Sequence, residues 1–233
     1  MEFLEMLLNN YTLLSFLVLA AVIFSMFCSF RVNYVFSHYK QVRTSANVRA
    51  CDAARQILDA NGLYDVQILR VPGKLTDHFD PKRNVIALSE SVYDSASVGA
   101  IGVAAHECGH AIQYAKSYTP IMLRNMIYPV VSICSQTWLW LFMIGCAIGL
   151  LGMVEIAIVF FGFVVLFQLI TLPVEFDASN RAIRTIAGMG LLYGEELKGA
   201  RKVLNAAAMT YVAALLVSLL QLLRLIAGTR RRN

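Results

Sequence analysis

Residues 127–172 form a long, mostly apolar run that Gly145, Gly149, Gly152 and Glu155 interrupt. A helix needs about 20 apolar residues to cross a bilayer, so this run is long enough for two crossings joined by a hairpin turn near Glu155. Residues 11–30 and 206–227 are shorter apolar runs, and each has a length that fits one crossing. Polar residues within 206–227 also allow that run to lie at the membrane interface. We therefore predict a predominantly α integral membrane protein with about four transmembrane helices.

The composition supports a membrane protein and excludes several other classes. The chain is 58% hydrophobic and 15% charged, with a mean hydropathy of +0.61. Its net charge of +5 is modest and is not gathered in one stripe, so we expect no nucleic-acid partner. The 5 cysteines form no CxxC pair, which indicates neither a disulfide framework nor a thiolate zinc site.

Two polar segments lie between the apolar runs. Residues 31–123 hold a helical pattern, two short strands at residues 66–71 and 84–88, and a second helix rich in small residues. Residues 173–205 resume a helical and partly amphipathic pattern. We expect these segments to form a small α+β layer, and residues 1–233 to fold as a single membrane-embedded unit.

The second helix of the polar segment carries the motif H-E-C-G-H at residues 106–110. Side chains four apart lie on one face of a helix, so His106 and His110 converge and form half of a tetrahedral zinc site. Glu107 then lies beside the open position as a general base, whereas Cys108 points away from that face and serves packing. In the alternative reading, the motif is a chance match with two buried histidines. That reading leaves buried polar groups unpaired at a cost of several kcal/mol, so we predict one Zn²⁺ per chain.

The order of the apolar runs restricts the third ligand. Two crossings return the chain to the side of the zinc helix near residue 172, and Glu155 lies at the far turn, roughly a bilayer thickness away. Glu175 and Asp177 are the first carboxylates after the return, and at most one of them faces the metal because they are two residues apart on a helix. Alternatively, the two carboxylates cap the start of a helix after Pro173, where negative charge is also favourable.

Three ordered motifs give the chain a family resemblance. The chain resembles the YugP-like bacterial membrane zinc metallopeptidases in L-T-D-H-F-D-P at residues 75–81, in the zinc helix through Gln113, and in L-P-V-E-F-D-A-S at residues 172–179. In the first motif, Phe79 stands where that family has Tyr. More distantly, the chain is similar to HtpX and the CaaX prenyl proteases, which are gluzincins with a glutamate ligand in an E-F-x-A-D box.

The resemblance selects Glu175 as the third zinc ligand and places Asp177 behind the ligands in a supporting role. Ser179 stands where the distant relatives carry Asp. The identity of the group that orients the ligand histidines is therefore open. Asp177 or a backbone carbonyl could take the place of the missing aspartate.

The resulting hypothesis is a membrane-bound zinc endopeptidase that hydrolyses membrane or unfolded polypeptides, with a zinc-activated water and Glu107 as the general base. The strand at residues 84–88 could accept the substrate as an edge strand. A site-2-type intramembrane protease is disfavoured because the chain has no L-D-G segment within an apolar run. A zinc-containing scaffold or inactive partner subunit is the other alternative, but a structural site has no use for Glu107. Candidates for the oxyanion donor are His78, Tyr93, Arg181 and Arg184.

Basic residues near the apolar runs predict the orientation. Most lie on the side of the zinc helix, and fewer, namely Arg224 and residues 230–232, lie on the other. Cytoplasmic segments are enriched in Lys and Arg, so we expect a multi-pass protein of the bacterial plasma membrane with the zinc site facing the cytoplasm. The residues on the zinc side are Arg31, Lys40, Arg43, Arg49, Lys116, Arg124, Arg181, Arg184, Lys198, Arg201 and Lys202.

Overall fold

The computed structural model describes residues 10–230, and these form two compact units. The apolar unit comprises the described parts of Met1–Cys28, Leu123–Leu172 and Thr210–Asn233. The mixed unit comprises Ser29–Met122 and Pro173–Met209. Arg231 and Arg232, which contribute to the orientation prediction, lie outside the described residues.

Four helices are long and apolar enough to cross a membrane: α2 (Tyr11–Tyr39), α5 (Thr119–Ile148), α6 (Leu151–Gly188) and α7 (Gly194–Arg230). The prediction of four membrane-crossing helices is confirmed at this level. The hairpin turn between α5 and α6 includes Gly149, whose φ of +72° is a conformation that glycine adopts without strain.

The long helices extend beyond the predicted apolar runs. Helix α2 continues past the predicted end at residue 30 and ends at Tyr39. Helix α6 passes through Pro173, and α7 joins the amphipathic stretch to the last apolar run. The predicted bounds therefore mark changes in hydropathy and not helix ends, because a helix continues wherever its backbone hydrogen bonds are made.

The mixed unit contains a three-stranded sheet in the order β1-β3-β2, formed by β1 (Gln67–Val71), β2 (His78–Asp80) and β3 (Val85–Ser89). Strand β3 pairs with β1 in parallel and with β2 in antiparallel register. The expectation that the strand at residues 84–88 offers a free edge to a substrate is therefore wrong. The short β2, for which no strand was predicted, takes that edge.

The L-T-D-H-F-D-P segment is held by its two carboxylates. Asp77 accepts hydrogen bonds from Ser89 N at 2.7 Å and from Ser89 Oγ at 3.1 Å, which fixes the approach to β2 against the end of β3. Asp80 accepts from the backbone nitrogens of Lys82 and Arg83 and closes the following turn. Both aspartates thus have a structural role in this motif.

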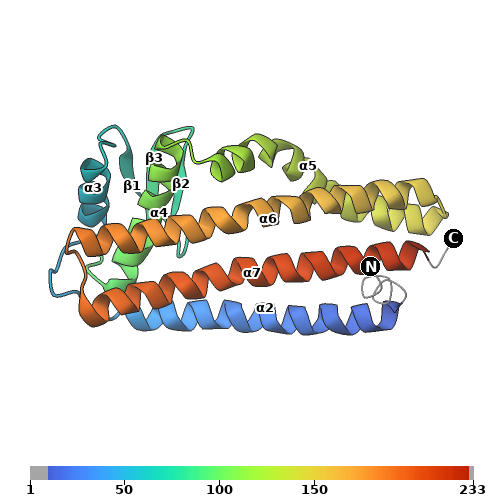
Figure 1. Ribbon diagram of the computed structural model, residues 1–233, viewed down its shortest axis with the longest axis horizontal. Helices are drawn as coiled ribbons and strands as arrows, with labels where there is room; N and C mark the ends of the chain where they lie inside the picture. The colour runs from blue at the N-terminus through green and yellow to red at the C-terminus, as the bar shows by residue number, and fades with distance from the viewer. Residues whose placement is uncertain (1–9, 231–233) are drawn as a thin grey trace. The chain divides into compact units, whose positions relative to one another are not determined.

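Helices α3 (Ala50–Ala60) and α4 (Val98–Ala115) pack against each other and share the main core of the mixed unit with β3 and parts of α6 and α7. Figure 1 shows the three strands close to α3 and α4. Ser97 caps α4 and its side chain accepts from Ala100 N. Gly99 lies against the backbone of Tyr39 and Lys40, and Gly102 lies against Ala200 of α7. These close approaches fix the position of α4.

Candidate metal centre

Helix α4 brings the two motif histidines together. The ring centroids of His106 and His110 are 4.7 Å apart and the rings meet edge to face. Most of α4 is buried, because its small residues allow neighbouring elements to approach on several sides. The i, i+4 spacing of the motif thus gives the convergence that the sequence predicts.

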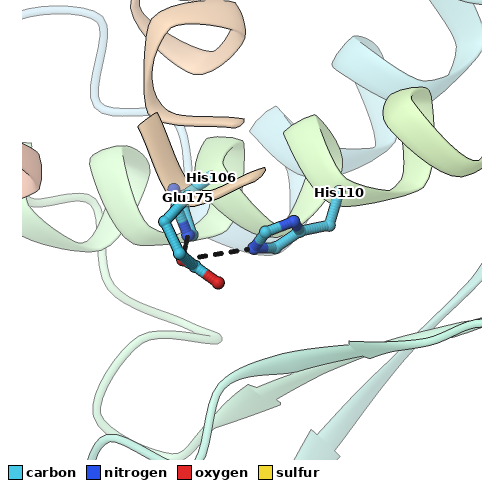
Figure 2. Close-up of side chains that lie close together, drawn as sticks. All are labelled: His106, His110 and Glu175. Carbon is cyan, nitrogen blue, oxygen red and sulfur yellow. Dashed lines mark ion pairs between the residues drawn. The ribbon is translucent and has the colours of Figure 1, made fainter. Parts of the chain in front are cut away.

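Glu175 of α6 completes a cluster of three possible ligands (Figure 2). Its Oε2 atom lies 3.3 Å from His106 Nε2 and 3.6 Å from His110 Nε2, and the ligand atoms of the three residues all lie within 4.8 Å of one another. The Glu175 side chain is 6% exposed and that of His106 is 17% exposed, so the cluster is reached most readily past His106.

These separations fit a zinc ion. Zinc binds imidazole nitrogen and carboxylate oxygen at about 2.0–2.2 Å in tetrahedral geometry, which places neighbouring ligand atoms roughly 3.3–3.6 Å apart. The two distances from Glu175 Oε2 match this edge length. Two imidazoles and one carboxylate leave the fourth position open, which is typical of catalytic rather than structural zinc.

Each histidine is held by a hydrogen bond at its other ring nitrogen. Ser179 Oγ lies 3.1 Å from His106 Nδ1, and Gln113 Oε1 lies 3.0 Å from His110 Nδ1. When both oxygens accept, the Nε2 lone pairs face Glu175 and the proposed metal position. The orienting groups are therefore a hydroxyl and an amide, whereas the sequence analysis considered Asp177 or a backbone carbonyl.

Asp177 supports His110 indirectly. Its Oδ2 atom accepts from Gln113 Nε2 at 2.8 Å and also from Arg181 Nε. The guanidinium group of Arg181 also lies over the ring of Tyr118, 5.7 Å from its centroid. Asp177 thus contacts the side chain that holds His110, and it is not one of the three clustered ligands.

Glu107 is buried next to the histidines, with 7% of its surface exposed. Across residues 10–230, which the structure describes, its carboxylate has no hydrogen-bond or ion-pair partner. Cys108 is fully buried and its Sγ faces the carbonyl oxygen of Ala54. Burial raises the pKa of the Cys108 thiol, so this side chain stays protonated and packs as an apolar group, as predicted.

The charge state of His110 depends on its carboxylate neighbours. Burial lowers the pKa of His110, but a hydrogen bond with Glu175 and the charges of Glu107 and Glu175 outweigh burial and raise that pKa above its ordinary value. In the metal-free protein, a proton therefore competes with a metal ion for this cluster.

Comparison with known proteins agrees with this donor set. Residues 14–230 match the family described as "Putative neutral zinc metallopeptidase". The chain belongs to this family. It is 48% identical over 211 residues to "Putative membrane protease YugP" of Bacillus subtilis (strain 168), a match that covers 91% of this chain and 94% of that protein. No solved structure matches the chain. The predicted resemblance to YugP-like proteins is thus confirmed.

The predicted oxyanion candidates lie in different surroundings. Tyr93 packs against the main core, and the Nδ1 atom of His78 lies 2.8 Å from the Thr76 carbonyl oxygen. Arg184 is exposed. Among residues 10–230, no direct hydrogen bond or ion pair joins these three side chains to the ligand cluster, and Arg181 reaches it only through Asp177 and Gln113.

The alternative role for Glu175, as a cap at the start of a helix after Pro173, is wrong. Helix α6 begins at Leu151, so Pro173 and Glu175 lie well inside a continuous helix. The favourable interaction of a carboxylate with a helix start acts only within the first turn. The burial of Glu175 between two imidazoles therefore needs another explanation, and metal binding supplies one.

Gly109 also shapes the site, and the sequence analysis did not single it out. A Cβ atom at this position would lie 2.6 Å from the carbonyl oxygen of Ala178 and 3.1 Å from its carbonyl carbon. The absence of a side chain thus lets α4 touch the α6 backbone beside Ser179. A glycine between the two histidines of the motif was the available signal for this close contact.

We expect Gly109→Ala to separate α4 from α6, because the added methyl group meets backbone atoms that cannot rotate away. The cost should be about 1–3 kcal/mol of unfolding free energy, together with reduced zinc content, since Glu175 is carried by the displaced helix. Thermal unfolding and metal analysis of the purified protein would measure both effects. Gly152→Ala is the matched control, because a Cβ there meets nothing within 4 Å. Unchanged stability and zinc content in Gly109→Ala would contradict the close packing.

Proposed function

We propose that the protein is a membrane-bound zinc endopeptidase of the gluzincin type, with His106, His110 and Glu175 as the protein ligands. The observation that carries the proposal is the buried cluster of these three side chains, whose spacing fits tetrahedral zinc. Membership of the zinc metallopeptidase family supports the same assignment. The four apolar helices support a position in the cell membrane.

Zinc bound there would polarise the scissile carbonyl and make a water nucleophile available near neutral pH. Glu107 accepts the proton of that water as it attacks, and then donates the proton to the leaving amine. Its buried carboxylate is suited to this task because no cation or hydrogen-bond donor among the described residues competes for its lone pairs. Ser179 and Gln113 keep the two imidazoles directed at the metal.

A polypeptide substrate would extend along β2. This strand lies at the edge of the sheet and contacts α4, and its Phe79 ring lies 6.1 Å from the ring of Tyr114 on α4. An extended segment that pairs with a sheet edge presents its backbone at regular intervals, so peptides of varied sequence are accommodated. The proposed substrates are membrane or unfolded proteins.

Zinc content and peptide hydrolysis, measured together, test the proposed function. The full chain purified in detergent should contain about one zinc per molecule and should hydrolyse an unfolded protein substrate. Removal of zinc with a chelator should abolish hydrolysis, and addition of zinc should restore it. A zinc-loaded protein that cleaves neither unfolded nor membrane substrates would favour the scaffold alternative.

We also propose that the metal site faces the cytoplasm. The chain carries more basic residues on the side of the zinc helix, which is the distribution expected of a cytoplasmic face. A cysteine introduced at the exposed Lys82 should therefore resist an impermeant thiol reagent in intact cells and react after permeabilisation. The native chain provides the background, since its cysteines are buried or only partly exposed. Labelling of the Lys82→Cys protein in intact cells would refute this orientation.

A further inference from the structure

Gln113 is an uncommon residue for its surroundings, because it is polar and its surface is 0% exposed. Its amide nitrogen lies 2.8 Å from the carbonyl oxygen of Val174 and 2.8 Å from Asp177 Oδ2. Its amide oxygen lies 3.0 Å from His110 Nδ1. The side chain therefore bridges α4 and α6 next to the ligand cluster.

The partners determine which way the amide points. A backbone carbonyl and an ionised carboxylate only accept hydrogen bonds, so both hydrogens of the Gln113 amide are directed toward Val174 and Asp177. Oε1 must then face His110, and it accepts the proton of Nδ1. A flipped amide would place its oxygen against two other acceptors and lose the hydrogen bonds to Val174 and Asp177.

A second link holds the amide in this orientation. The Asp177 oxygen that accepts from Gln113 also accepts from Arg181 Nε. The Arg181 guanidinium group holds the Asp177 carboxylate in place through this hydrogen bond. The ring of Tyr118, in the connection between α4 and α5, lies under the guanidinium group and supports it. The order of contacts is thus Arg181, Asp177, Gln113 and His110.

We propose that Gln113 is a positioning residue that fixes the tautomer of His110, and that Arg181 and Asp177 hold its amide in the required orientation. The inference rests on the proposed function, because it takes His110 as a zinc ligand. With Nδ1 protonated, the Nε2 lone pair of His110 is free for the metal, and the ring cannot rotate without breaking a buried hydrogen bond. The arrangement requires an amide at position 113, since a carboxylate there would face Val174 O and Asp177.

The experiment measures the zinc dissociation constant of the full chain in detergent by competition with a chromophoric chelator. Gln113→Leu should weaken zinc binding roughly 10- to 100-fold, as is typical when a group that holds a ligand histidine is removed. The absorption spectrum of the cobalt-substituted protein gives a second readout, which should show altered coordination. Gln136→Leu is the matched control, because within the described part of the chain this amide bonds only Ser132 of α5.

Gln113→Glu tests whether His110 requires an amide at position 113 that fixes its tautomer, or only a strong hydrogen-bond acceptor there. A carboxylate would strengthen the hydrogen bond to His110, but it would repel Val174 O and Asp177, so we expect zinc binding at least as weak as in Gln113→Leu. Adding Asp177→Asn supplies an amide that donates to Glu at position 113, and this double variant should recover part of the lost affinity. If Gln113 served only to fill space in the core, the double variant would recover no zinc affinity.

Two results would overturn the inference: zinc affinity of Gln113→Leu within twofold of the native value, or tighter binding in Gln113→Glu than in the native chain. If Gln113→Leu fails to fold, Asp177→Ala takes its place, because it removes one acceptor and leaves Gln113 present. Unchanged affinity and an unchanged cobalt spectrum in Asp177→Ala would then count against the inference. Failure of the proposed function is distinct, since the native chain itself would then lack zinc or peptide hydrolysis.

Discussion

Glu107→Gln is expected to retain zinc and the native fold while losing nearly all peptide hydrolysis. Glu107 is not one of the three clustered side chains, so its replacement leaves the proposed ligand set of His106, His110 and Glu175 intact. An amide cannot accept the proton of the attacking water. Loss of a general base lowers rates by about 10²- to 10⁴-fold, and we expect a reduction of at least this size.

Single-turnover hydrolysis of an unfolded substrate by zinc-loaded protein would measure the effect, with zinc content determined on the same sample. Glu195→Gln is a suitable control, because Glu195 is 84% exposed and pairs only with Lys198 among the described residues. Hydrolysis at the native rate in zinc-loaded Glu107→Gln would show that another group acts as the base.

The regular features of the chain were predictable because each has a local signal. Hydropathy located the four long helices, and the i, i+4 spacing of His106 and His110 predicted that these two side chains converge. The order of the apolar runs restricted the third ligand to Glu175 or Asp177, and the box match selected Glu175. The strands at residues 66–71 and 84–88 correspond to β1 and β3.

The remaining features depend on contacts between segments that are distant in sequence. The position of β3 at the centre of the sheet depends on β2, which has only three residues and therefore no clear alternating pattern. The role of Gln113 depends on Val174 and Asp177, which are 61 and 64 residues away. Its place one turn after His110 was a signal, but the chemistry of its partners could not be read from that spacing.

At Ser179, the family resemblance predicted the position of a group that orients a histidine but not the identity of that group. The E-F-x-A-D box of the distant relatives predicts a carboxylate at this position, and its absence suggested that another group orients the histidines. In the structure, Ser179 itself lies 3.1 Å from His106 Nδ1. A hydroxyl thus occupies the place expected for the carboxylate, since a residue one turn after Glu175 on α6 faces the same side of the helix.

Glu175→Ala is expected to purify with little zinc and without activity. The variant removes one of the three clustered ligands and leaves two imidazoles, which cannot complete a tetrahedral site without additional water. Because binding to a preformed site contributes to stability, the loss of zinc should also lower the unfolding temperature. Metal analysis, hydrolysis and thermal unfolding of the same preparation would measure the three effects.

Glu155→Ala provides the comparison, because Glu155 is an exposed carboxylate in the first turns of the same helix. It should stay zinc-loaded and active, which would show that removing a carboxylate from α6 is not harmful in itself. If Glu175 served only the local stability of α6, its loss would lower the unfolding temperature and leave the metal bound. Full zinc occupancy in Glu175→Ala would therefore remove Glu175 from the ligand set. Zinc depletion confined to Glu175→Ala would instead tie the metal to the part of α6 that follows the apolar run, as the box match and the cluster geometry lead us to expect.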